Sequence, residues 1–162
     1  MNYFKATEKY LYNYRAIRAN IEILEQQLQM LKDDVKGASA VDTTREPVSK
    51  TYKFTSATED EVLHREEDIA ELERQILSEK NVIEKIDKGI TSLPELERAV
   101  VEMKYMSGES LSWVQIAERV GYSVDHCKGK VRRKAVERVA VAVYGLKALN
   151  SFKPLPLFEW VG

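Results

Sequence analysis

The chain has 162 residues, of which 31% are charged and 44% are hydrophobic, and its formal net charge at pH 7 is −1. This length predicts one domain or two small ones with a modest core, and the near-neutral total argues against a simple basic coat for nucleic acid. The single cysteine, Cys127, excludes an intramolecular disulfide, and the two histidines, His64 and His126, lack the spacing of zinc ligands. We expect no metal, no cofactor and no catalytic site.

No apolar run approaches the roughly 18 residues that a membrane helix needs. The amino-terminal sequence, MNYFKATEKY, lacks the basic-then-apolar order of a secretory signal. We therefore expect a cytoplasmic protein that does not act at a membrane.

Residues 4–36 are predicted to form a helix of coiled-coil character. Apolar side chains recur there in alternating steps of four and three residues, which is the heptad pattern of a coiled-coil seam. This first seam consists of Tyr10, Tyr14, Ile17, Ile21, Leu24, Leu28, Leu31 and Val35. No glycine or proline interrupts the stretch, and we expect Gly37 to end the helix as a C-terminal cap.

A second helix is predicted to begin near Thr58, an N-cap followed directly by three acidic residues that suit the positive end of the helix dipole. Its apolar residues recur at a strict spacing of seven: Val62, Ile69, Ile76, Ile83 and Ile90. Leu72 and Ile86 occupy the companion heptad position, whereas Arg65 and Glu79 interrupt it, so this seam is weaker than the first.

Two heptad helices in succession either fold back on each other as a helical hairpin or pair with a second chain. The pattern favours neither arrangement. We interpret residues 1–90 as a helical, coiled-coil oligomerisation region. Residues 37–57 are predicted to form a linker within it, because their Gly, Ser, Thr and Pro content is typical of a connection. The residues assigned to a homodimer seam are Tyr14, Ile17, Ile21, Leu24, Leu28 and Leu31.

The last third of the chain predicts three short helices. Ser92-Leu-Pro-Glu95 has the spacing of a capping box and begins the first, which Ser107-Gly108 ends. Ser112 begins the second with Gln115 as its capping partner, and its inner face carries Trp113, Ile116, Ala117 and Val120. Gly121 provides a tight turn. Ser123 begins the third, whose inward residues are Val124, Cys127, Val131 and Ala135.

The third helix also concentrates positive charge. Residues 56–90 have a net charge of −6 and residues 122–162 a net charge of +5. Helix, turn and helix at this spacing, with basic residues on the outward face, predict DNA binding over a merely solvated charge run. The candidate DNA-binding residues are Ser123, Asp125, His126, Lys128, Gly129, Lys130, Arg132, Arg133 and Lys134.

Residues 92–138 resemble region 4 of the σ70-type sigma factors. The resemblance rests on Leu93-Pro94-Glu95, Ser112 with Ile116-Ala117-Glu118, Gly121 with Ser123, and the basic helix that follows. The rest of the chain has no counterpart of the sigma-factor segment that opens the promoter. A heptad amino-terminal half joined to a region-4-like end is similar instead to phage late-gene activators of the ArpU/RinA type, which implies an all-α regulator acting with host RNA polymerase.

The start of the third helix, with Ser123, His126, Lys128 and Lys130, is expected to reach base edges, and Arg132 and Arg133 to follow the phosphates. Gly129 departs from the polar residue or arginine that the family places nearby. A glycine in a helix interior costs about 1 kcal/mol of stability, and it either permits close approach to the DNA backbone or weakens specificity. Cys127 is interpreted as a small buried apolar side chain.

We expect the third helix to continue through residue 149 as part of a DNA-binding domain spanning residues 91–149. Residues 150–162 are then an apolar tail that docks on the protein's own helices or contacts RNA polymerase or a second subunit.

The predicted function is a sequence-specific, homodimeric transcriptional regulator, with double-stranded DNA as partner and a salt slope of about −4 per protomer. Two alternatives stay open. One is a small terminase subunit, which also joins a helix-turn-helix to oligomerising helices, and the other is a coiled-coil interaction protein that does not bind DNA.

Overall fold

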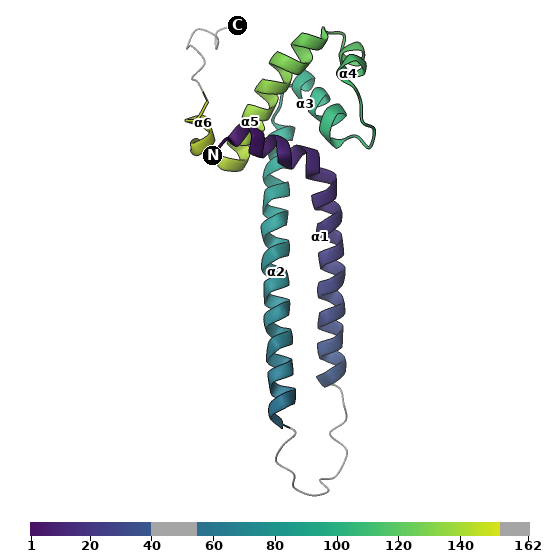
Figure 1. Ribbon diagram of the computed structural model, residues 1–162, viewed down its shortest axis with the longest axis vertical. Coiled ribbons are helices and arrows are strands. Elements are labelled where there is room, and N and C mark those ends of the chain that lie inside the picture. The colour runs from purple at the N-terminus through teal and green to yellow at the C-terminus, as the bar shows by residue number, and fades with distance from the viewer. Residues whose placement is uncertain (40–54, 153–162) are drawn as a thin grey trace, which may run out of the picture. The chain divides into compact units, whose positions relative to one another are not determined.

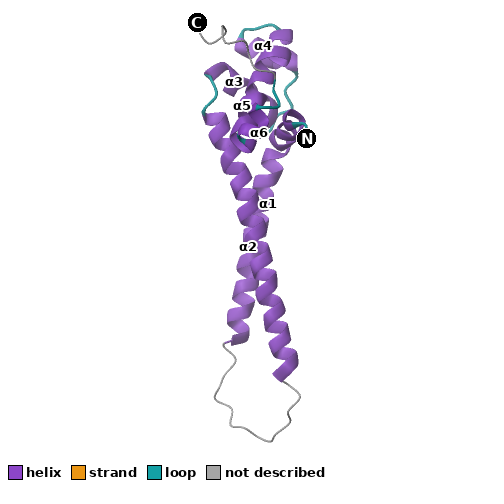
Figure 2. Ribbon diagram, turned by 90° about the vertical axis from the view of Figure 1, so that its left-hand side faces the viewer, coloured by secondary structure: helices purple, strands orange, loops and turns teal. Residues whose placement is uncertain are grey.

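The computed structural model describes residues 1–39 and 55–152, and every regular element in these ranges is a helix (Figures 1 and 2). The elements are α1 (Tyr3–Ser39), α2 (Thr55–Thr91), α3 (Glu95–Val101), the π-helical segment η1 (Glu102–Met106), α4 (Trp113–Val120), the π-helical segment η2 (His126–Val131), α5 (Arg132–Tyr144) and α6 (Leu146–Leu149). The all-α fold class, with long amino-terminal helices followed by a helical domain, is therefore confirmed. None of the helices in these ranges is both long and apolar enough to cross a membrane.

The chain forms two compact units. One, the hairpin unit, spans residues 19–80, and the other, the head unit, combines residues 1–18 with the chain from residue 81 onward. This division differs from the boundary near residue 90 that the sequence suggested, because the first turns of α1 and the last turns of α2 pack with the short helices that follow them.

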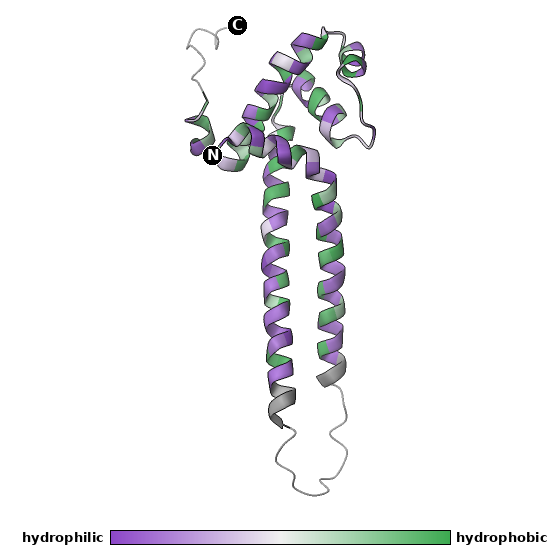
Figure 3. Ribbon diagram, viewed as in Figure 1, coloured by the Kyte–Doolittle hydropathy of each residue, from purple (hydrophilic) through white to green (hydrophobic). Residues whose placement is uncertain are grey.

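The hairpin unit holds α1 and α2 side by side, in antiparallel order (Figures 1 and 2). The order follows from the cross-helix ion pairs, since Lys32 pairs with Glu73 at 2.6 Å and Glu25 pairs with Lys80. Apolar residues recur along both helices (Figure 3). Of the two arrangements that the heptad pattern allows, the structure thus has the helical hairpin, in which α1 packs on α2 of the same chain.

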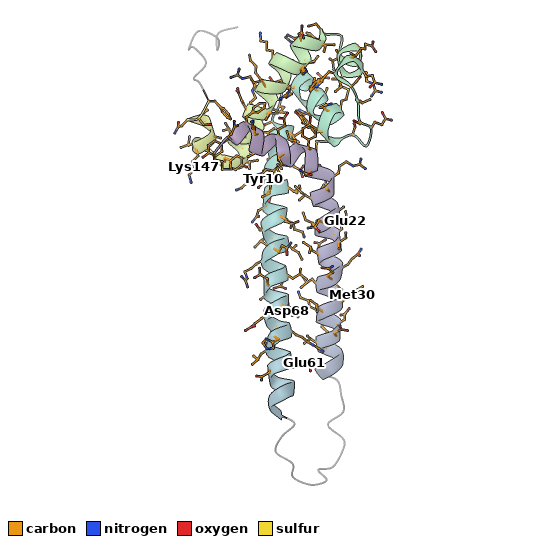
Figure 4. All side chains as sticks on the ribbon, in the orientation of Figure 1. Tyr10, Glu22, Met30, Glu61, Asp68 and Lys147 are labelled. Atoms are coloured by element: carbon orange, nitrogen blue, oxygen red, sulfur yellow. The ribbon has the colours of Figure 1, made fainter. Side chains whose placement is uncertain are left out.

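The seam residues assigned to a homodimer are used inside one chain. Tyr14, Ile21 and Leu24 are buried, and Ile17, Leu28 and Leu31 are half-buried. The hairpin nevertheless leaves apolar side chains exposed outside its seam: Ile23, Met30, Leu63 and Leu77. Figure 4 labels Met30 on α1 and Asp68 on α2, which help to line a hollow of about 490 Å³ beside the seam.

Val62 is the seam residue of α2 that the pattern misjudged, because 42% of it is exposed. The helix ends also differ from the predictions. Helix α1 runs past Gly37 to Ser39, and α2 begins at Thr55 rather than near Thr58. Residues 40–54 of the expected linker lie outside the described residues.

In the head unit, the first turns of α1 bury Thr7, Leu11 and Tyr14, while the last turns of α2 bury Ile86 and Ile90. The Tyr14 hydroxyl donates to Oδ1 of Asp87 at 2.5 Å and accepts from Nη1 of Arg18 at 2.9 Å. These contacts tie α1 to α2 within this unit.

Helices α2 and α5 approach each other closely at Gly89. A Cβ atom at this position would lie 3.0 Å from Cβ of Ala142 and 3.3 Å from Cα of Val139. Because an alanine Cβ and a backbone Cα cannot rotate away, the absence of a side chain at Gly89 permits the crossing.

The short helices of the head unit surround an apolar core. Val100, Leu111, Ile116 and Val131 are buried together, and the half-buried residues packed against them are Leu96, Met103, Trp113 and Val120. Most of the inward positions predicted for α4 and the helix after it are buried: Ile116, Ala117, Cys127, Val131 and Ala135. The other three, Trp113, Val120 and Val124, are half-buried. The predicted core of this region is therefore confirmed at five of eight positions.

Two predictions about helix ends in the head unit are wrong. The Ser92 hydroxyl donates to the Gly89 carbonyl at 2.7 Å instead of capping α3, whose N-cap is Pro94 without a side-chain hydrogen bond. The last long helix stops at Tyr144, because Gly145 takes a φ of +65° and begins the separate turn α6. Most of the apolar tail, residues 153–162, lies outside the described residues.

We predict that Ser112→Ala lowers the free energy of unfolding by about 1 kcal/mol, because the Ser112 side chain caps α4 and accepts from the Gln115 N–H. Urea denaturation of both variants measures this, with Ser110→Ala as the control because Ser110 is exposed in the preceding loop. Equal midpoints for the two variants would contradict the assignment of the cap.

Candidate nucleic-acid interface

Helix α4 and the helix after it are joined by a tight turn with well-defined caps. Ser112 and Gln115 form the predicted capping box at the start of α4. Gly121 takes the left-handed conformation, with a φ of 75°, and the N–H groups of Gly121 and Tyr122 both donate to the Ala117 carbonyl. The Ser123 hydroxyl then accepts from the His126 N–H at 3.2 Å. These contacts produce a helix-turn-helix arrangement.

The second of these helices is continuous from Val124 to Tyr144, and we call it the basic helix. Its first part includes the π-helical segment η2, in which Cys127 and Val131 are buried. A π-helical turn holds more residues than an α-helical turn and is often found at functional sites. The candidate residues of the basic helix and its cap that are exposed are Ser123, Asp125, Lys128, Gly129, Lys130 and Arg133.

His126 and Lys134 are half-buried. The His126 ring stacks on the ring of Tyr122, with 5.1 Å between centroids and 17° between planes, and Tyr122 itself is 50% exposed. The Tyr122 ring thus presents an exposed flat surface at the start of the basic helix, backed by the half-buried His126 ring. Tyr122 was not among the candidate residues, because it precedes the basic run.

Arg132 does not lie on the open face where the sequence placed it. Its side chain is only 25% exposed, and its Nε atom lies 3.0 Å from Oε1 of Glu8 in α1. Its guanidinium also lies over the Phe4 ring, 5.6 Å from the centroid. The heptad pattern of α1 gives no sign of this contact, because the partners are more than 120 residues apart in the sequence.

Glu8 contacts a second helix of the head unit as well. The Tyr105 hydroxyl of η1 donates to Oε1 of Glu8 at 2.7 Å. Burial raises the pKa of Tyr105 above its ordinary value, and the bond to the Glu8 carboxylate raises it further. Tyr105 therefore stays protonated and keeps its hydrogen bond across the physiological range, so that Glu8 connects η1 to the start of α5.

The remaining arginines near the interface are also paired. Arg133 Nε lies 2.9 Å from Oε1 of Glu137, and Arg138 Nη1 lies 3.4 Å from Oε2 of Glu97. By contrast, no carboxylate in the described ranges pairs with Lys128 or Lys130. Within the described ranges, these two lysines are exposed cations without a carboxylate partner.

Cys127 is fully buried, and burial raises the pKa of its thiol. A thiol with a raised pKa is a poor nucleophile, so its position in the core agrees with the packing role inferred from the sequence. Among the described residues, no group of three or more His, Cys, Asp or Glu side chains is placed to hold a metal ion.

Comparison with known families gives one match over residues 5–139, to a family described as a protein of unknown function, DUF722. The chain belongs to the DUF722 family. No curated protein and no solved structure matches it. The DUF722 match begins in the first turn of α1, spans both long helices and reaches Val139 in α5, so it covers both Glu8 and the basic helix.

Replacing two glycines of this candidate interface by alanine is expected to change the free energy of unfolding in opposite directions. Gly121→Ala is expected to lower the free energy of unfolding by about 1 kcal/mol, because alanine is strained at a φ of 75° even though its Cβ would meet no atom within 4 Å. Gly129→Ala is expected to raise it by up to about 1 kcal/mol, because Gly129 is helical and its Cβ would also meet no atom.

Thermal and urea denaturation of both variants test this, with each protein serving as the control for the other. A loss of stability in Gly129→Ala would mean that η2 requires glycine for its backbone.

Proposed function

We propose that this DUF722 protein is a sequence-specific DNA-binding transcriptional regulator that makes its contacts through the exposed face of the basic helix. The observation that carries the proposal is that Lys128 and Lys130 are exposed and have no carboxylate partner among the residues that the structure describes, on the second helix of a helix-turn-helix arrangement. In such an arrangement the second helix enters the major groove of DNA, where base edges are accessible.

The exposed residues divide into two roles under this proposal. Ser123 and Asp125 lie at the start of the basic helix, where they offer the donors and acceptors that read base edges. Lys128, Lys130 and Arg133 follow them and bind phosphates, which fixes the register of the protein on the duplex. The net charge of −6 on residues 56–90 is repelled by phosphate, which disfavours binding through that segment.

We further propose that the regulator belongs to the phage late-gene activator type and acts with RNA polymerase as a homodimer. The support is the region-4-like sequence of residues 92–138 together with the heptad helices before it. Because the seam of α1 is used within the chain, a homodimer would form through another surface. A ring of many subunits in light scattering would favour the small terminase alternative instead.

The test is binding to duplex DNA by Lys128→Ala/Lys130→Ala. We expect weaker binding to all duplexes and a log–log salt slope that is shallower by about 2, because two phosphate-attracting charges are removed. The matched control is Lys85→Ala/Lys147→Ala, which removes the same charge from two exposed lysines of α2 and α6. Fluorescence anisotropy at a series of salt concentrations gives both quantities.

This lysine pair is a cleaner test than Arg132→Ala/Arg133→Ala, because loss of Arg132 also leaves Glu8 without its ion-pair partner. If wild type binds no duplex DNA at low salt, the DNA-binding proposal is wrong. The same holds if the Lys128/Lys130 variant and its control have the same affinity and salt slope.

A further inference from the structure

A pocket of about 310 Å³ lies beside the exposed face of the basic helix. It is lined by Phe4, Lys128, Gly129, Arg132, Arg133 and Glu137. Five of these residues come from the basic helix, and Phe4 comes from the first turn of α1. The pocket therefore extends the candidate interface beyond the basic helix, because Phe4 of α1 forms part of its lining.

Both arginines of the pocket approach a carboxylate through Nε, although only one of them forms a hydrogen bond there. Arg133 Nε donates to Oε1 of Glu137, whereas Arg132 Nε lies 3.0 Å from Oε1 of Glu8 as an ion pair without a hydrogen bond. The closest contact of each ion pair is thus made by Nε and not by a terminal Nη group. A guanidinium fixed at one edge keeps the other edge available for bidentate contact with an oxyanion.

Charge in and around the pocket favours an anion. Lys128, Arg132 and Arg133 supply three positive charges, against the two carboxylates of Glu8 and Glu137. Phe4 also belongs to the first turn of α1, where the helix dipole is positive.

Gly129 and Phe4 give the pocket its shape. No atom lies within 4 Å of the position where a Cβ of Gly129 would stand, so the glycine leaves space rather than relieving a clash. The Phe4 ring of α1 lies against the Arg132 guanidinium of the basic helix. The volume equals that of roughly ten water molecules, which accommodates a phosphate group and its remaining hydration.

We propose that this pocket binds a phosphodiester group of the DNA backbone, so that the first turn of α1 completes the nucleic-acid interface. The inference rests on the proposed DNA-binding function. It adds one phosphate contact, made jointly by Arg132 and Arg133 with the help of Lys128. It also explains the glycine in the basic helix, because Gly129 leaves the space that the phosphate group would occupy.

The first test compares Gly129→Leu with Gly129→Ala. Both variants remove the glycine from the helix, but the leucine side chain also fills the pocket. We expect Gly129→Ala, which adds only a methyl group to the pocket, to lose less affinity for duplex DNA than Gly129→Leu does. We expect Gly129→Leu to lose one phosphate contact, with a salt slope shallower by about 0.9 and binding about eightfold weaker at 0.1 M salt. Circular dichroism establishes that both variants are folded.

The second test compares Phe4→Ala with Tyr3→Ala. Both residues lie in the first turn of α1 and contact other helices, but Tyr3 packs on the Tyr144 ring, with 5.1 Å between centroids, and does not line the pocket. We expect weaker DNA binding by Phe4→Ala alone. This pair remains informative if Gly129→Leu fails to fold.

The outcomes separate the two proposals. Absence of duplex binding by wild type overturns both the DNA-binding function and the phosphate pocket. Wild-type binding with identical affinities and slopes for Gly129→Leu and Gly129→Ala, or for Phe4→Ala and Tyr3→Ala, overturns the pocket and leaves the DNA-binding function standing. The pocket is supported if Gly129→Leu binds duplex DNA more weakly than Gly129→Ala, and Phe4→Ala more weakly than Tyr3→Ala.

Discussion

The Glu8 carboxylate holds together the part of the molecule on which the candidate interface depends. It accepts a hydrogen bond from Tyr105 and pairs with Arg132, although its own side chain is only 18% exposed. Loss of Glu8 would leave the Arg132 guanidinium without its ion-pair partner and the Tyr105 hydroxyl without its acceptor. The first turns of α1 are thereby fixed to both η1 and the basic helix. This contact explains why the head unit includes residues from the beginning of the chain.

Local sequence patterns predicted the elements whose determinants lie within a few residues. The capping box of Ser112 with Gln115, the left-handed Gly121 and the buried positions of α4 and the basic helix each follow from short-range rules. The heptad spacing of α1 identified its buried stripe, but spacing is the same for a hairpin and a dimer. The cross-helix contacts, among them the ion pairs of Glu25 and Lys32, establish that the partner is α2 of the same chain.

Features that depend on distant partners were not predictable in this way. Arg132 sits between inward positions of a basic run, so the pattern placed it outside, whereas contact with Glu8 and Phe4 turns it toward α1. Ser92 had the spacing of a cap, but its hydroxyl has a nearer acceptor in the Gly89 carbonyl. Gly37 and Gly145 look alike in sequence, and only the second leaves the helical conformation.

The constant register of the hairpin limits how its length can change. In both ion pairs across the hairpin the two residue numbers add to 105, and the apolar positions recur every seven residues along each helix. An insertion or deletion of seven residues in one helix, matched by the same change opposite, keeps the seam residues and these ion pairs aligned. An unmatched change shifts one helix against the other and brings like charges together. The length of the hairpin can thus change in whole heptads, while the residues of the head unit stay the same.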